Sequence, residues 1–171
     1  MLPFWWELLD RRVRIWYHTR RNQSGLNGGV WVKLSTRCRY GIHAMADLAQ
    51  HYGQGPQSLR EIAERQEVSE TFLEQIFGAL RREGFVESVR GAQGGYLLAR
   101  PPGEITIGAL MRLLDGPILM ADCMAEGGSG CSRSEGCPSK AVWARLTRYF
   151  NQMADSITLE DMLSDEESDK E

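Results

Sequence analysis

The sequence predicts a mainly α-helical fold that carries a small two-stranded β-wing and ends in a long helix. From residue 35 onward, apolar residues recur at the spacing of helices. Serine or threonine precedes most of these segments, where an N-cap satisfies the first free N–H groups of a helix. A glycine-rich turn over residues 90–95 separates two short segments that alternate like strands. This order of segments predicts a winged helix-turn-helix domain followed by further helices.

The first predicted helix covers residues 35–52 and begins at the N-cap Ser35. Its apolar stripe consists of Cys38, Ile42, Met45 and Ala49. We expect Cys38 to be buried, since free cysteine behaves as a small apolar residue. His43 lies one step off the stripe, and we expect it to be exposed.

A helix-turn-helix follows the first helix. Ser58 and Glu61 form a capping box that opens a short helix ending near residue 66. Ser69 caps a longer helix that continues to Gly84. A short helix, a tight turn and a longer helix are typical of this motif.

The wing and three more helices follow the second helix of this motif. The predicted strands cover residues 85–89 and 96–99, and the predicted helices cover 106–116, 138–154 and 158–163. Pro138 is placed at a first helical position, where its missing N–H costs nothing. We expect the acidic residues 164–171 to be disordered.

The chain divides into four parts: an appendage (1–31), the winged domain (32–100), a loop with the later helices (101–163) and the acidic tail (164–171). The appendage holds four of the five tryptophans. One hypothesis is an amphipathic helix near residues 4–17. The alternative, which we favour, is that translation begins at Val32.

Composition excludes several classes of protein. Of the 171 residues, 42% are hydrophobic and 25% are charged, which is typical of a globular domain. The sequence contains no apolar run of the roughly 20 residues that a spanning helix requires, so we expect no membrane partner. Few cysteines and no recognisable signal peptide indicate the cytoplasm. The common catalytic motifs are absent from the sequence, so we do not expect an enzyme.

The winged domain predicts binding to double-stranded DNA, with the second helix in the major groove and the wing in the neighbouring minor groove. We expect contacts from Ser69, Thr71, Glu74 and Gln75 on this helix and from Arg90 at the wing tip. Residues suited to phosphates are Arg37, Arg39, Arg60, Arg81 and Arg82. The alternative is a winged domain used for protein contacts, in which these arginines are simply solvated.

Three cysteines, Cys123, Cys131 and Cys137, lie within 15 residues of the predicted loop. Thiolates are soft ligands for zinc, copper(I) or iron-sulfur clusters. Zinc sites usually contain closely spaced Cys-x2-Cys pairs, so the wider spacing favours an iron-sulfur cluster. The alternative is a set of free or disulfide-forming thiols.

Five segments closely resemble the iron-sulfur cluster regulator family (IscR) and its nitric-oxide-sensing relative (NsrR): 32–40, 62–66, 72–75, 88–96 and 157–161. The resemblance covers Val32 to about Leu163. It implies a homodimer joined through the helix at about 138–154, which binds a palindromic operator through the five DNA-contacting residues named above. It also implies a cluster on the three loop cysteines, which we expect to be 2Fe-2S rather than 4Fe-4S.

The fourth cluster ligand departs from the family pattern. Lys140 stands where the iron-sulfur regulator has a histidine, and Arg39 stands where the nitric-oxide sensor has an aspartate. The remaining candidates are an exogenous thiol and the residues Asp122, Glu126, Glu135 and Cys38.

We therefore expect a cytoplasmic, dimeric transcriptional repressor whose operator binding is controlled by an iron-sulfur cluster, and which senses iron-sulfur, redox or nitric oxide status. One alternative is a cluster-free repressor controlled by thiol oxidation or cysteine metabolism. Another is a zinc-stabilised protein-interaction module without DNA affinity.

Overall fold

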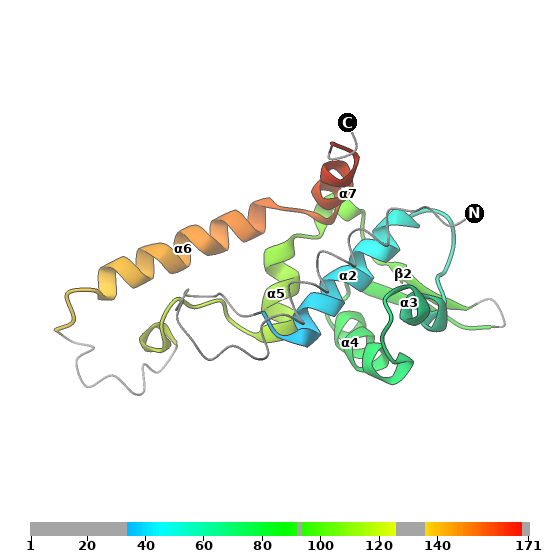
Figure 1. The fold of residues 1–171 in the computed structure, drawn as a ribbon, viewed down its shortest axis with the longest axis horizontal. Helices are drawn as coiled ribbons and strands as arrows, with labels where there is room; N and C mark the ends of the chain where they lie inside the picture. The colour runs from blue at the N-terminus through cyan, green and yellow to red at the C-terminus, as the bar shows by residue number, and fades with distance from the viewer. Residues whose placement is uncertain (1–33, 92–93, 126–135, 169–171) are drawn as a thin grey trace, which may run out of the picture. The chain divides into compact units, whose positions relative to one another are not determined.

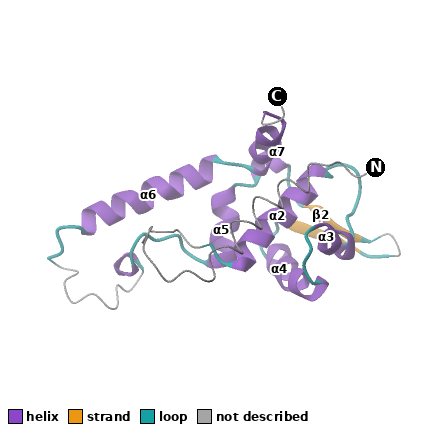
Figure 2. Ribbon diagram, viewed as in Figure 1, coloured by secondary structure: helices purple, strands orange, loops and turns teal. Residues whose placement is uncertain are grey.

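The computed structural model describes residues 34–91, 94–125 and 136–168, so the predicted appendage at 1–31 lies outside the described residues. The α-helices are α2 (Thr36–Gln50), α3 (Leu59–Arg65), α4 (Glu70–Arg82), α5 (Ile107–Asp115), α6 (Lys140–Ser156) and α7 (Leu159–Ser168). The strands are β1 (Val86–Val89) and β2 (Gly95–Leu98), and two short 3-10 helices are η1 (Pro102–Glu104) and η2 (Asp122–Met124). Figures 1 and 2 show this mainly helical arrangement with its single hairpin, which confirms the predicted fold class.

The predicted N-caps are all present. The Ser35 hydroxyl accepts a hydrogen bond from the third N–H of α2, and Ser69 and Thr106 do the same for α4 and α5. Ser58 and Glu61 form the complete capping box of α3. Each such cap contributes about 1 kcal/mol, so these local signals explain why the helices begin where they do.

The hydrophobic core lies where α4 packs against α2, α3, α5 and β1. On the inner face of α4, Leu73, Ile76, Phe77 and Leu80 are completely excluded from solvent. Burying side chains of this size contributes about 1.5–3 kcal/mol each. The apolar periodicity of this helix therefore determines which face packs inward and which face is left to solvent.

The wing is an antiparallel hairpin in which Val86 pairs with Leu98 and Val89 with Gly95. Tyr96 also exchanges two backbone hydrogen bonds, of 3.0 and 2.8 Å, with Gln57 in the loop before α3. A Cβ atom at position 95 would lie 2.3 Å from the Gln57 carbonyl oxygen, so only glycine permits this approach. The wing is thereby attached to the helix-turn-helix through backbone.

The bounds of the wing differ slightly from the predicted strands at 85–89 and 96–99. The N–H of Phe85 donates to the Leu80 carbonyl at 2.9 Å. Phe85 therefore lies between α4 and β1: its N–H bonds the end of the helix, while its carbonyl accepts from Ala99 N–H at 3.0 Å. At the other strand, the pairing already begins at Gly95.

Two C-terminal helices also have bounds that differ from the predicted ones. α6 begins at Lys140, with Ser139 rather than Pro138 at its start, and it continues to Ser156. α7 continues to Ser168, although residues from 164 onward are expected to be disordered. Glutamate is a good helix former, so the acidic composition does not stop this helix. Within the described residues, every helix is too short or too polar to cross a bilayer.

A buried ion pair holds α2 to α3. The carboxylate of Asp47 is only 4% exposed and accepts hydrogen bonds from Arg65 Nε at 2.8 Å and Nη2 at 2.7 Å. Two parallel bonds between a guanidinium and a carboxylate fix the geometry of both side chains. The pair therefore sets the angle at which the helix-turn-helix leaves the first helix.

Replacing Arg65 with alanine is expected to lower the free energy of unfolding by about 1–3 kcal/mol, because the Asp47 carboxylate stays buried without its main donor. Urea denaturation measures this loss. The matched control is Arg60→Ala, since Arg60 pairs with Glu64 on the exposed surface of α3. That change is expected to cost much less, because an exposed ion pair contributes little to the free energy of unfolding. Equal losses in the two variants would contradict the role of the buried pair.

Candidate nucleic-acid interface and cysteine site

The outer face of α4 carries the predicted DNA-contacting residues. Thr71, Glu74 and Gln75 are exposed and lie at i, i+3 and i+4, so they share one face of the helix. Ser69 is also exposed, but its hydroxyl already accepts the bond from Phe72 N–H at 3.2 Å that caps α4. A hydroxyl that accepts still has a proton to donate. The four side chains can therefore present donors and acceptors to a groove from one end of the helix.

The wing tip presents Arg90. This residue is exposed and directly follows β1, and the next residue, Gly91, has a φ of 126° that reverses the chain. The aromatic rings of Tyr96 in β2 and Phe77 in α4 contact each other at a centroid distance of 4.7 Å. The wing and α4 therefore pack directly on each other behind the surface that carries Arg90.

The arginines suited to phosphates fall into two groups. Arg37, Arg60, Arg81 and Arg82 are exposed, whereas Arg39 is half-buried. Arg39 places its guanidinium 5.5 Å from the centre of the Tyr40 ring, and Arg60 forms an ion pair with Glu64 at 2.9 Å. Arg81 Nη1 donates to Ser88 Oγ at 3.5 Å, so both groups include arginines that already have partners within the protein.

Cys38 has the environment of a core residue. It is fully buried at the start of α2, which confirms the prediction. Burial raises the pKa of its thiol to about 11, and the nearby Asp115 carboxylate adds to the shift. A thiol with so high a pKa is almost entirely protonated at neutral pH, whereas the ligand form of cysteine is the thiolate. His43 is exposed, as predicted.

The loop cysteines have a different environment. Cys123 lies in η2 and Cys137 lies just before α6; both are free thiols and half-buried. The Cys137 sulfur is 3.2 Å from the Ser139 hydroxyl oxygen. Hydrogen bonds from Ser139 lower the pKa of Cys137, with further help from Lys140. The start of α6 thus favours a thiolate at this position.

The third loop cysteine, Cys131, lies outside the described residues, as do the predicted ligand candidates Glu126 and Glu135. Among the residues that the structure describes, no three side chains of histidine, cysteine, aspartate or glutamate gather closely enough to hold a metal. What the structure adds is the position of η2, which packs against α6. Cys123 therefore lies in a segment that contacts α6, and Cys137 lies in the segment that leads directly into α6.

A polar network between α5 and α6 escaped the sequence analysis. Arg112 of α5 contacts Asn151 and Asp155 of α6, and Thr147 of α6 contacts the segment before η2. One signal was available in the sequence: Thr147, Asn151 and Asp155 recur every four residues, which places polar groups along one face of the helix. Periodicity alone cannot show which partner such a polar face meets.

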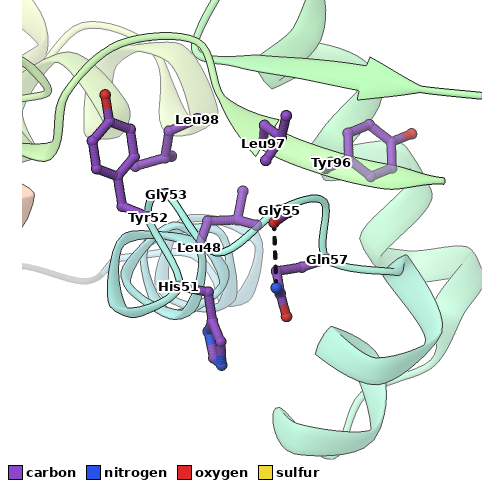
Figure 3. A pocket seen from close by; sticks show the side chains of 9 residues that line it. All are labelled: Leu48, His51, Tyr52, Gly53, Gly55, Gln57, Tyr96, Leu97 and Leu98. Atoms are coloured by element: carbon purple, nitrogen blue, oxygen red, sulfur yellow. Dashed lines mark hydrogen bonds between the residues drawn. The ribbon is translucent and has the colours of Figure 1, made fainter. Parts of the chain in front are cut away.

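A pocket of about 300 Å³ lies between the end of α2, the loop before α3 and β2 (Figure 3). Its lining includes His51, Tyr52, Gln57 and Tyr96. None of the predicted DNA-contacting residues or loop cysteines lines it. The candidate site is therefore the outer surface of α4 and the wing, together with the cysteine segments, rather than this pocket.

Comparisons with known proteins agree with this geometry. The family model Rrf2, described as an iron-dependent transcriptional regulator, matches residues 34–165. CymR of Bacillus subtilis is 38% identical over 140 residues, which cover 82% of this chain and 96% of that protein. Its solved structure, described as the global cysteine regulator, matches with a TM-score of 0.66 over 78% of this chain and 98% of that one.

Two regulators named IscR are also similar. That of Sodalis glossinidius is 38% identical over 136 residues, covering 80% of this chain and 81% of that protein. The solved structure of T. potens IscR is 44% identical, with a TM-score of 0.68 over 84% of this chain and 95% of that one. These matches confirm the prediction of a DNA-binding transcriptional regulator rather than an enzyme. The chain belongs to the Rrf2 family of transcriptional regulators.

Proposed function

We propose that this regulator is a dimeric repressor whose operator binding is controlled by an iron-sulfur cluster held by Cys123, Cys131 and Cys137. The observation that carries the proposal is the contrast between two cysteines of one chain. Cys38 is buried with a raised pKa, whereas Cys137 is accessible at a helix start with a lowered pKa. A lowered pKa increases the thiolate fraction of Cys137, and the thiolate is the form of cysteine that binds a metal.

The donor set fits an iron-sulfur cluster, which takes cysteine thiolates as its ligands. When bound, such a cluster supplies a centre that responds to iron supply and to oxidants. The segments that carry Cys123 and Cys137 both adjoin α6. A change in the state of this centre can therefore be transmitted to the rest of the protein through one helix. Asp122, Glu126, Glu135 or an exogenous thiol remains the candidate for the fourth ligand, and we favour a 2Fe-2S cluster.

A second function is favoured by the similarity to CymR, described as a global cysteine regulator. In that case the chain is a cluster-free repressor that responds to thiol oxidation or to cysteine metabolism. The zinc-stabilised module without DNA affinity has less support, because the family consists of transcriptional regulators.

The surface of α6 supports a homodimer. Its outer face carries a stripe of large apolar side chains that are 37–55% exposed: Val142, Trp143, Leu146, Tyr149 and Met153. Four of these lie at i, i+4, i+7 and i+11, the spacing of a helix face that packs against another helix. A second copy of α6 is the partner we propose, and the resulting pair of winged domains suits a palindromic operator.

Iron and sulfide analysis of anaerobically purified protein tests the cluster. A coloured protein with about two irons per subunit is expected, since a 2Fe-2S cluster contains two. Cys123→Ser and Cys137→Ser are expected to lose the colour and the iron, whereas the matched control Cys38→Ala keeps both. Colourless, iron-free wild-type protein that binds its operator would favour the thiol-based repressor instead.

Alkylation of the iron-free protein tests the pKa contrast. With iodoacetamide, Cys137 is expected to react with a midpoint below the ordinary cysteine pKa of 9.0, while Cys38 stays unmodified in the native protein. A lowered pKa increases the thiolate fraction at neutral pH, and the thiolate is the reactive form. Ser139→Ala is expected to move the Cys137 midpoint to higher pH. Mass spectrometry across a pH series measures both sites, and an unmoved midpoint in Ser139→Ala would contradict the assignment.

DNA binding is measured with a duplex that the wild-type protein enriches from a random pool. Gln75→Ala is expected to lose roughly 1–3 kcal/mol of discrimination at one base pair. Arg90→Ala is expected to weaken binding, because the minor groove loses the cation that the wing tip places in it. Gln152→Ala on α6 is the control, and its affinity should match the wild type. Unchanged affinity in both Gln75→Ala and Arg90→Ala would contradict the proposed interface.

A further inference from the structure

The segment before Cys123 is held by side chains of α6. Residues 116–121 continue from α5 to η2 without helix or strand. The N–H of Met120 donates to Thr147 Oγ1 at 3.1 Å, and Asn151 Nδ2 donates to the Ile118 carbonyl at 3.0 Å. Two α6 side chains one turn apart therefore hold the backbone that leads to the first loop cysteine.

Asn151 is fully engaged in this network. Its Nδ2 also donates to the Thr147 carbonyl at 2.8 Å, and its Oδ1 accepts from Arg112 Nη1 at 3.1 Å. Carbonyl oxygens only accept and a guanidinium only donates, so one orientation of the amide satisfies all three partners. Asn151 thus joins the segment, α6 and α5 at one point.

Arg112 continues the network into α5. Its Nη2 lies 2.5 Å from Asp155 Oδ1 of α6, and its Nη1 lies 3.3 Å from Asp155 Oδ2. The guanidinium therefore has one bidentate partner and one amide partner on the same helix. The two hydrogen bonds between Arg112 and Asp155 resist rotation of α6 relative to α5 more than a single bond would.

α5 in turn contacts the DNA-reading part of the fold. Asp115, at its end, accepts hydrogen bonds from the backbone and the hydroxyl of Ser35 at the start of α2. A Cβ atom at Gly41 of α2 would lie 2.4 Å from Leu114 of α5 and 3.4 Å from Ile76 of α4. The side chains of Leu114 and Ile76 therefore meet the α2 backbone at Gly41, which joins α5, α4 and α2 in close contact.

We propose that Thr147 and Asn151 are positioning residues that couple the Cys123 segment to the recognition helix α4. The route runs from the 118–120 backbone through these two side chains to Arg112 of α5. It continues from α5 to α4, which contact each other (Figure 1). The inference rests on the proposed role of the loop cysteines, because it names how their state reaches the DNA-binding surface. Neither residue contacts a thiol or the predicted DNA surface in these bonds.

Thr147→Val and Thr147→Ser form the matched pair of variants that tests the coupling. Valine keeps the shape and β-branching of threonine but removes the hydroxyl that accepts from Met120, whereas serine keeps that hydroxyl. Hydrogen exchange of the peptide 117–124 is measured in the full chain with and without a saturating duplex, selected by the wild-type protein from a random pool. Coupling between two sites is reciprocal, so DNA binding must change the protection of this segment.

The expected result is a DNA-dependent change in exchange of roughly 5- to 150-fold in the wild type, the usual size of such coupling. Thr147→Ser is expected to keep this change. Thr147→Val and Asn151→Ala are expected to reduce the ratio of exchange rates with and without DNA to near one. Urea denaturation checks that these two variants are folded. The inference is overturned if DNA leaves the wild-type segment unchanged, or if Thr147→Val responds like the wild type. If anaerobically purified wild-type protein contains no iron but still shows a Thr147-dependent response, the cluster proposal fails while the coupling stands.

Discussion

The burial of one face of α4 is the constraint on which the other features depend. Four large apolar side chains of this helix are removed from solvent against α2, α3 and α5, and the helix is too short to have a stable structure on its own. Packing therefore stabilises α4 and determines which face of the helix points outward. Thr71, Glu74 and Gln75 are exposed because they lie on that outer face. Loss of the core would therefore also disrupt the proposed DNA-binding surface.

The fold was largely predictable because its signals are local. N-caps, a capping box and apolar spacing indicate helices through neighbours in the chain, and Ser35, Ser58, Ser69 and Thr106 all act as expected. The differences occur where local preference competes with other effects. At the start of α6, the preference of Pro138 for a first helical turn was outweighed, and the helix begins after Ser139. At α7, the charged composition that predicts disorder is also rich in glutamate, which favours helices.

The site was predictable only in its surface residues. Exposed polar positions on α4 follow from its periodicity, and the assignment of Cys38 to the core follows from its place in the apolar stripe of α2. The contrast in thiol pKa depends on what surrounds each sulfur, namely burial together with Asp115 for Cys38 and hydrogen bonds from Ser139 for Cys137. The Arg112 network depends on contacts between residues about forty positions apart. No pattern within a single helix contains that information.

The backbone pairing of Gln57 with Tyr96 affects how the DNA-reading surface can evolve. Because the wing is attached to the helix-turn-helix through main-chain hydrogen bonds, a glycine at 95 and the contact of Tyr96 with Phe77, its orientation does not depend on its exposed side chains. Substitutions at exposed positions of the hairpin can therefore change the surface that we propose contacts DNA without altering the angle between the wing and α4. The proposed contact surface and the frame that presents it are separable.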